Sequence, residues 1–144
     1  MNYSGRSFPG RNFVGQDLRG VDFTDTFLVG ADFTRADLRG AIFCGAHLGW
    51  ADFKDANTES AVFDDAQWLS IPICQAPILI RDLYYVVVIL SDHMRIGCET
   101  HTIEEWTAFH DNEIVGMDGR NALRFWRDHK FDLLQLVKHP RFGK

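Results

Sequence analysis

The stretch ADFTRADLRGAIFCGAHLGWADF, residues 31–53, repeats itself every five residues. Alanine returns at every fifth position, and a Phe or Leu stands two residues after each alanine. A period of five matches neither the turn of a helix nor the two-residue alternation of a strand. A fixed short repeat that combines a small and a large apolar column indicates a solenoid, in which each unit is buried against its neighbours.

The same register extends in both directions along the chain. The large-residue column, whose members we call the centre positions, runs from Phe8 to Trp68, and eight consecutive alanines precede the later centres by two residues. The position before the centre is often Asp or Asn, and the position two after it is often Gly. Ile73 and Ile78 also fall on centre positions, so we expect the repeat to continue to about residue 80.

The centre residues also follow a second period of twenty residues. Four series result, namely Phe13, Phe33 and Phe53; Leu18, Leu38 and Thr58; Phe23, Phe43 and Phe63; and Phe8, Leu28, Leu48 and Trp68. Phe and Leu segregate almost completely between these series. Such segregation is expected if four repeats make one coil, because close-packed coils stack each ring on its equivalent.

The repeat resembles that of the pentapeptide-repeat family, whose unit is written A(D/N)LXX; ADFTRADLRG and ADFKDAN match it directly. The resemblance covers approximately residues 6–80. It implies a mainly β fold, a right-handed quadrilateral β-helix of under four coils. The centre residue and the small residue two before it would point inward, and the other three outward. We expect this solenoid to form one domain, residues 1–80.

Residues 81–144 lack the five-residue period, and we expect them to form a small α+β cap, a hairpin plus two helices. The hairpin would pair residues 83–91 with 95–100 through a turn at 92–94. Thr102 and Glu105 have the spacing of a capping box, which predicts a short helix through Phe109. A longer helix is predicted over 121–138, with one apolar stripe. That stripe comprises Leu123, Trp126, Phe131, Leu134 and Val137.

Part of this second region has a further resemblance. The stretch RIGCETHTIEEWTAFHDNEIVGMDGRNALRFWRDHK, residues 95–130, is similar to a C-terminal cassette of small phage and prophage proteins. In those proteins an I-G-C motif and a later F-W pair follow a hairpin. The resemblance implies a phage or prophage origin, and therefore a bacterial host cell.

Composition narrows the class of protein. Of the 144 residues 46% are hydrophobic, and the net charge of −5 argues against direct binding to nucleic acid or to an anionic membrane. The longest apolar run, residues 84–90, is shorter than the roughly 20 residues of a membrane span. Three cysteines without a framework suit a reducing compartment. We therefore expect a soluble cytoplasmic protein.

Catalytic and metal-binding motifs give little support to an enzyme. Cys98 and His101 form a C-x-x-H pair with His93 and His110 nearby, but a second close ligand pair, which structural zinc sites usually have, is missing. Phosphate-binding, dinucleotide-binding and hydrolase motifs are also missing from the sequence. We predict no catalytic residue, no cofactor and no metal site.

Two outward-facing sets of side chains are candidate binding surfaces. The anionic set consists of Asp17, Asp32, Asp37 and Asp52. Family members that act on DNA gyrase resemble B-DNA in width and charge, and the resemblance implies a similar role for this set. The alternative is that Asp or Asn before the centre only serves the turn backbone. Arg19 and Arg39 would then partly neutralise the carboxylates beside them.

The apolar set consists of Phe27, Val29, Ile42, Trp50 and Val62. Outward apolar groups on neighbouring faces indicate that something packs on them. The candidates are the chain's own helix over 121–138, a second copy in a homodimer, or a partner.

The leading hypothesis is a non-enzymatic protein-binding module. It would be a phage or prophage inhibitor that docks onto a host protein that normally binds nucleic acid. That host protein would be a topoisomerase or, as for anti-CRISPR proteins, a defence nuclease. The alternative is a structural or assembly module that binds its partner through the apolar set.

Overall fold

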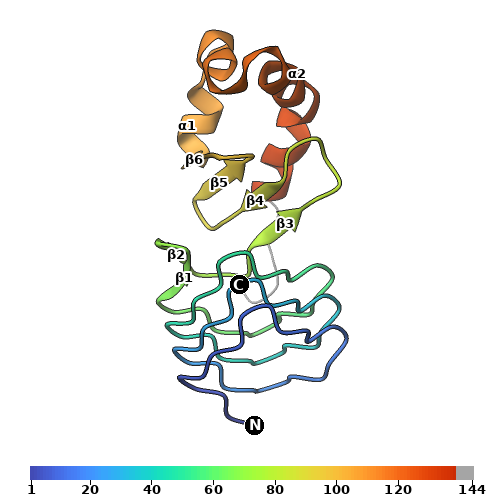
Figure 1. Ribbon diagram of the computed structural model, residues 1–144, viewed down its shortest axis with the longest axis vertical. Helices are drawn as coiled ribbons and strands as arrows, with labels where there is room; N and C mark the ends of the chain where they lie inside the picture. Colours follow the sequence, from blue (N-terminus) through green and yellow to red (C-terminus); the bar gives the residue numbers. More distant parts are fainter. Residues whose placement is uncertain (139–144) are drawn as a thin grey trace. The chain divides into compact units, whose positions relative to one another are not determined.

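The computed structural model describes residues 1–138. The chain divides into two compact units, the first comprising Met1–Leu79 and the second beginning at Ile80 (Figure 1).

The first unit winds in coils of twenty residues that stack on one another (Figure 1). Parallel bridges join each residue before a centre to its equivalent one coil later, and they form four ladders. We name the four faces of the coil by these ladders: face A (Asn12, Asp32, Asp52), face B (Asp17, Asp37, Asn57), face C (Asn2, Asp22, Ile42, Val62) and face D (Ser7, Phe27, His47, Gln67). The predicted stacking of residues twenty positions apart is confirmed, whereas the right hand of the coil stays a prediction.

The interior is filled by the centre residues and the small residues two before them. Phe33 is fully buried, and its ring lies 4.9 Å from those of both Phe13 and Phe53, at interplanar angles of 2° and 17°. Ala31 and Ala41 are also fully buried. A larger side chain at these alanine positions would overpack the core between the rings.

Every backbone amide of a regular repeat has an acceptor, as residues 32–36 illustrate. The Phe33 amide donates to the next coil at 2.7 Å, and the Asp32 amide donates to the preceding coil at 2.9 Å. Arg35 donates to the next coil and Ala36 to the carbonyl of Phe33, both at 2.9 Å. The remaining amide, of Thr34, donates to the Asp32 carboxylate at 2.9 Å. The Asp or Asn of the repeat therefore completes the hydrogen bonding of its own turn.

The corners of the coil require left-handed backbone two residues after each centre. Glycine holds most of the early corners because it adopts positive φ without a steric penalty. Gly45, with φ of 66°, is constrained further, because a Cβ there would lie 2.2 Å from a carboxylate oxygen of Asp25. The positive φ required at the corners explains the glycine column of the sequence.

The repeat begins and ends earlier than predicted. Tyr3 is the first centre, since Asn2 bridges to Asp22 and the Tyr3 ring lies 5.5 Å from that of Phe23. At the other end the chain reverses after Trp68. Strands β1 (Ala66–Trp68) and β2 (Ile71–Ile73) pair antiparallel, with Ala66 opposite Ile73.

The prediction that Ile73 and Ile78 continue the coil is therefore wrong. Leu69 adopts left-handed backbone, with φ of 55°, one position before the corner residues do. That shift converts a corner of the coil into a two-residue hairpin loop.

A sheet of strand order β3-β4-β5-β6 follows. Its first strand, β3 (Ile78–Ile80), spans the division of the chain after Leu79, and the other three strands belong to the second unit. Strands β4 (Val87–Ile89), β5 (His93–Ile96) and β6 (Glu99–Thr102) form an antiparallel meander. The predicted strand over 95–100 is wrong, because the chain turns at Gly97, with φ of 59°, and separates β5 from β6.

Two helices follow. Helix α1 (Ile103–Ala108) begins with the predicted capping box, since Thr102 and Glu105 exchange side-chain-to-backbone hydrogen bonds of 2.8 and 3.1 Å. Helix α2 (Asp111–Lys138) consists of two arms joined at Asp118 and Gly119, where the backbone is not helical. The second arm agrees with the helix predicted over 121–138, whereas the first arm was not predicted.

The predicted apolar stripe of α2 is partly wrong. Phe131 is 72% exposed, whereas Phe125 and Leu133 join Trp126 in the core. Leu123, Leu134 and Val137 of the predicted stripe are half-buried, so the inward face is shifted rather than replaced.

The stacked rings generate the first prediction. Phe33→Ala should lower the free energy of unfolding by about 3–5 kcal/mol, because it leaves a cavity between two parallel rings. Phe27→Ala is the matched control, since Phe27 points outward and is 49% exposed. Chemical denaturation measures both variants. A loss below about 1 kcal/mol for Phe33→Ala would contradict the assignment of the core.

Candidate protein-binding surface

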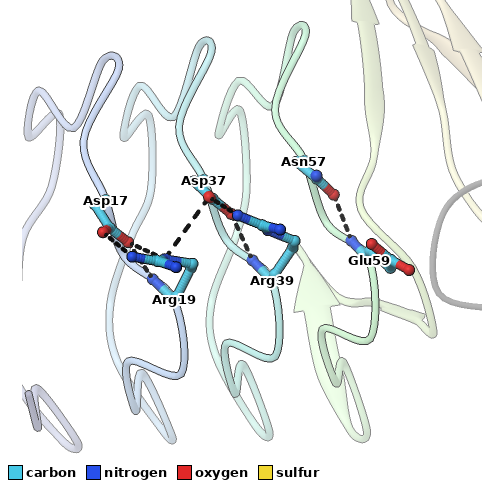
Figure 2. A network of polar contacts seen from close by, with 6 residues as sticks. All are labelled: Asp17, Arg19, Asp37, Arg39, Asn57 and Glu59. Carbon is cyan, nitrogen blue, oxygen red and sulfur yellow. Dashed lines mark hydrogen bonds and ion pairs between the residues drawn. The ribbon is translucent and has the colours of Figure 1, made fainter.

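The predicted anionic residues all take part in turns. Asp32 and Asp52 on face A accept the amides of Thr34 and Lys54, both at 2.9 Å. On face B, Asp17 and Asp37 accept the amides of Arg19 and Arg39 at 3.3 Å, and Asn57 does the same one coil further on (Figure 2). These side chains therefore serve the backbone, whatever else they contact.

Face B is also largely neutralised by arginine. Arg19 lies 2.6 Å from Asp17 and 3.8 Å from Asp37, so that it links two coils (Figure 2). Arg39 pairs with Asp37 at 2.6 Å. The hydrogen bonds from Arg19 lower the pKa of Asp17 to about 2. Face A likewise combines signs, because Arg35 and Lys54 belong to its repeats.

Face C has a different charge pattern. Its repeats, residues 1–5, 21–25, 41–45 and 61–65, contain four Asp and neither Lys nor Arg. The four are Asp22, Asp25, Asp64 and Asp65. Asp25, Asp64 and Asp65 are exposed. The sequence analysis missed this surface. Grouping the charged residues by the twenty-residue period would have revealed four Asp without Lys or Arg on one face.

The predicted apolar residues fall on faces C and D. Phe27 and Val29, on face D, are 49% and 43% exposed, and Ile42 and Val62, on face C, are 36% and 37% exposed. We call these four residues the apolar patch. Trp50 differs from them, because it is half-buried and its ring lies 4.9 Å from that of the buried Trp68. Leu69, 50% exposed on face D, was missed by the sequence analysis.

The apolar patch replaces the residues that complete the turns elsewhere. Ile42 and Val62, as well as Phe27 and His47, stand where other repeats have Asp or Asn. The apolar side chains of Ile42, Val62 and Phe27 cannot accept the amide two residues later. Among residues 1–138 the amides of Val29, Cys44 and Asp64 accordingly have no such side-chain acceptor. Faces A and B thus keep the complete turn structure, which face D lacks throughout and face C in its later coils.

The C-x-x-H pair of the sequence, Cys98 and His101, lies within the meander, where His101 belongs to β6. His101 contacts Glu99 at 3.3 Å and Glu105 at 3.7 Å, and its ring packs edge-on against Trp106. Cys98 is exposed in the turn between β5 and β6. Within residues 1–138, no group of three or more His, Cys, Asp or Glu side chains is placed to hold a metal ion. No helix in the same range is both long and apolar enough to cross a membrane.

The ion pairs of face B generate a prediction about acid. Because the folded-state pKa of Asp17 is depressed, the stabilisation from its pairing is present above the unfolded value near 4 and is lost as the pH falls through about 2. Carboxyl titration by NMR should therefore place the Asp17 midpoint near 2, and Arg19→Gln should move it towards 4. Arg39→Gln, which affects Asp17 only from a distance, is the control. A midpoint that Arg19→Gln leaves unchanged would refute the pairing.

Comparison with known proteins bears on the first unit. The sequence model of the pentapeptide-repeat family matches eight copies over residues 4–35 and 31–67. A solved pentapeptide-repeat protein from the thylakoid lumen of Arabidopsis thaliana is 26% identical, with a TM-score of 0.20 over 46% of this chain and 64% of that one. This chain thus spans less than two thirds of that protein's length. Curated proteins gave no significant match. Residues 4–67 therefore carry the repeat of the pentapeptide-repeat family.

Proposed function

We propose that this protein is a non-enzymatic binding module that docks a partner protein on faces C and D of its coil. The observation that carries the proposal is the apolar patch, bordered by acidic residues that no Lys or Arg of the same repeats neutralises. Pentapeptide-repeat proteins are in general non-enzymatic interaction modules, which supports the same class of function.

The local chemistry supports these faces over the others. Each apolar residue of the ladders on faces C and D removes a side-chain acceptor from its turn, and a hydrogen bond of this kind contributes about 0.5–1.5 kcal/mol. The apolar side chains remain exposed to solvent, although the Phe27 ring also stacks on that of His47 at 4.4 Å. Positions where the repeat gives up its consensus Asp or Asn and exposes an apolar side chain instead are typical of functional surfaces.

The charges indicate the chemistry of the partner. An interface usually combines an apolar centre with a polar rim, and complementary charge accelerates association and selects partners. Asp22, Asp25, Asp64 and Asp65 lie around Ile42 and Val62 in the repeats of face C. We therefore propose a partner whose contact surface has an apolar centre and a basic rim.

A second, narrower candidate rests on the same four carboxylates. A host protein that normally binds nucleic acid offers a basic groove, and the carboxylates of face C would occupy it in place of phosphates. Under this proposal the protein is a phage or prophage inhibitor acting in the bacterial cytoplasm. Face C is better suited to this role than Asp17 and Asp37, which are paired with arginine.

The proposal is tested by substitutions that keep the turns intact. A partner is first recovered from bacterial lysate by affinity capture and identified by mass spectrometry. Ile42→Asn with Val62→Asn restores the consensus acceptor and removes apolar area, so the thermal midpoint should hold or rise while affinity falls at least tenfold. Asp32→Asn with Asp52→Asn is the matched control, because Asn still accepts the turn amide.

Two further measurements separate the candidates. If the acidic rim guides binding, Asp64→Asn with Asp65→Asn should slow association and flatten its salt dependence. An affinity that is insensitive to Ile42→Asn with Val62→Asn, but lost in the face A control, would overturn the proposal. Sedimentation of the free protein shows whether the partner is a second copy of the chain.

A further inference from the structure

The second unit contains a pocket of about 210 Å³ that the proposed function does not use. It lies between the β5–β6 turn, α1 and both arms of the bent helix α2. Three buried aromatic side chains, Trp106, Phe125 and Trp126, contribute to its wall, together with the buried Ile114. The pocket is smaller than most drug-sized sites, so it suits a compact ligand.

The polar lining of this pocket is acidic. Asp118 and Glu99 are its charged residues, and the lining contains no Lys, Arg or His. The Tyr85 hydroxyl donates a hydrogen bond to one carboxylate oxygen of Asp118. Glu99 is shared with His101, whose Nε2 lies 3.3 Å away, so Asp118 is the carboxylate on which the argument depends.

The bend in α2 fixes Asp118 at this place. Gly119 has φ of 65° and ψ of −151°, a conformation that is essentially restricted to glycine. This conformation of Gly119 separates the two arms of α2, and both arms line the pocket.

The aromatic wall and the carboxylate select one class of ligand. Ring faces attract cations, most strongly where water is excluded, and a carboxylate beside them adds a direct ionic partner. Trp106 and Trp126 lie 5.2 Å apart, and Tyr85 lies 5.1 Å from Phe125. We propose that this pocket binds a small organic cation, an ammonium group carried on a compact apolar body. Either a free amine or the lysine side chain of a peptide provides that chemistry.

The test uses the full chain and three probes. Phenethylamine supplies an ammonium and an apolar body, 2-phenylethanol is its neutral counterpart, and Nα-acetyl-lysine methyl ester represents a peptide side chain. Calorimetry and tryptophan fluorescence should show saturable binding of phenethylamine at least tenfold tighter than that of the alcohol. Tighter binding of the lysine ester than of phenethylamine would also support the site and identify its ligand as a side chain.

Variants decide whether the pocket is responsible. Asp118→Asn retains an oxygen acceptor for Tyr85 and should weaken phenethylamine binding at least tenfold while leaving the alcohol unaffected. Ala122→Phe fills the pocket and should abolish binding of every probe. Asp132→Asn, an exposed change on the same helix, is the matched control and should bind as the parent protein does.

Circular dichroism melts establish that each variant is folded. The absence of saturable binding to the parent protein would overturn the proposal. Equal affinities for the amine and the alcohol would also overturn it.

Discussion

Stacking of each centre residue on its equivalent one coil later is the constraint on which the first unit depends. The ring of Phe33 lies 4.9 Å from its neighbours above and below, a separation close to that of adjacent hydrogen-bonded strands. The same spacing allows the Phe33 amide to reach the next coil at 2.7 Å. This spacing also accounts for the small residues beside the rings and for the left-handed backbone at the corners, because a coil this tight leaves little room for larger side chains or wider turns.

Much of this unit could be predicted from the sequence because the repeat places the same demand at every fifth residue. The resemblance to the pentapeptide-repeat family implied four repeats to a coil, and the segregation of Phe from Leu by face supported that geometry. Both ends were misplaced for local reasons. Tyr3 occupies a centre position without being Phe or Leu, and Leu69 adopts a backbone that the period cannot reveal. The turn at Gly97 depends likewise on one residue.

The proposed binding surface was harder to predict, because composition does not distinguish an aspartate that completes a turn from one that is available to a partner. Asp17 and Asp32 occupy the same position of the repeat, and both accept a turn amide. Of the two, however, only Asp17 is paired with an arginine. The relevant signal in the sequence was that Ile42 and Val62 replace the consensus Asp or Asn, on a face whose repeats contain aspartates but neither Lys nor Arg. The residues that line the pocket near Asp118 are distant from one another in the sequence, so no sequence motif predicted it.

The central claim is that Asp and Asn side chains complete the turns of faces A and B, whereas the later turns of faces C and D lack such an acceptor. Backbone hydrogen exchange tests it most directly, because each turn amide reports its own hydrogen bond. The amides of Thr34 and Thr24, which donate to carboxylates at 2.9 Å, should be protected, and those of Val29, Cys44 and Asp64 should exchange near the rate of an unstructured chain. Equal protection of both groups would contradict the account.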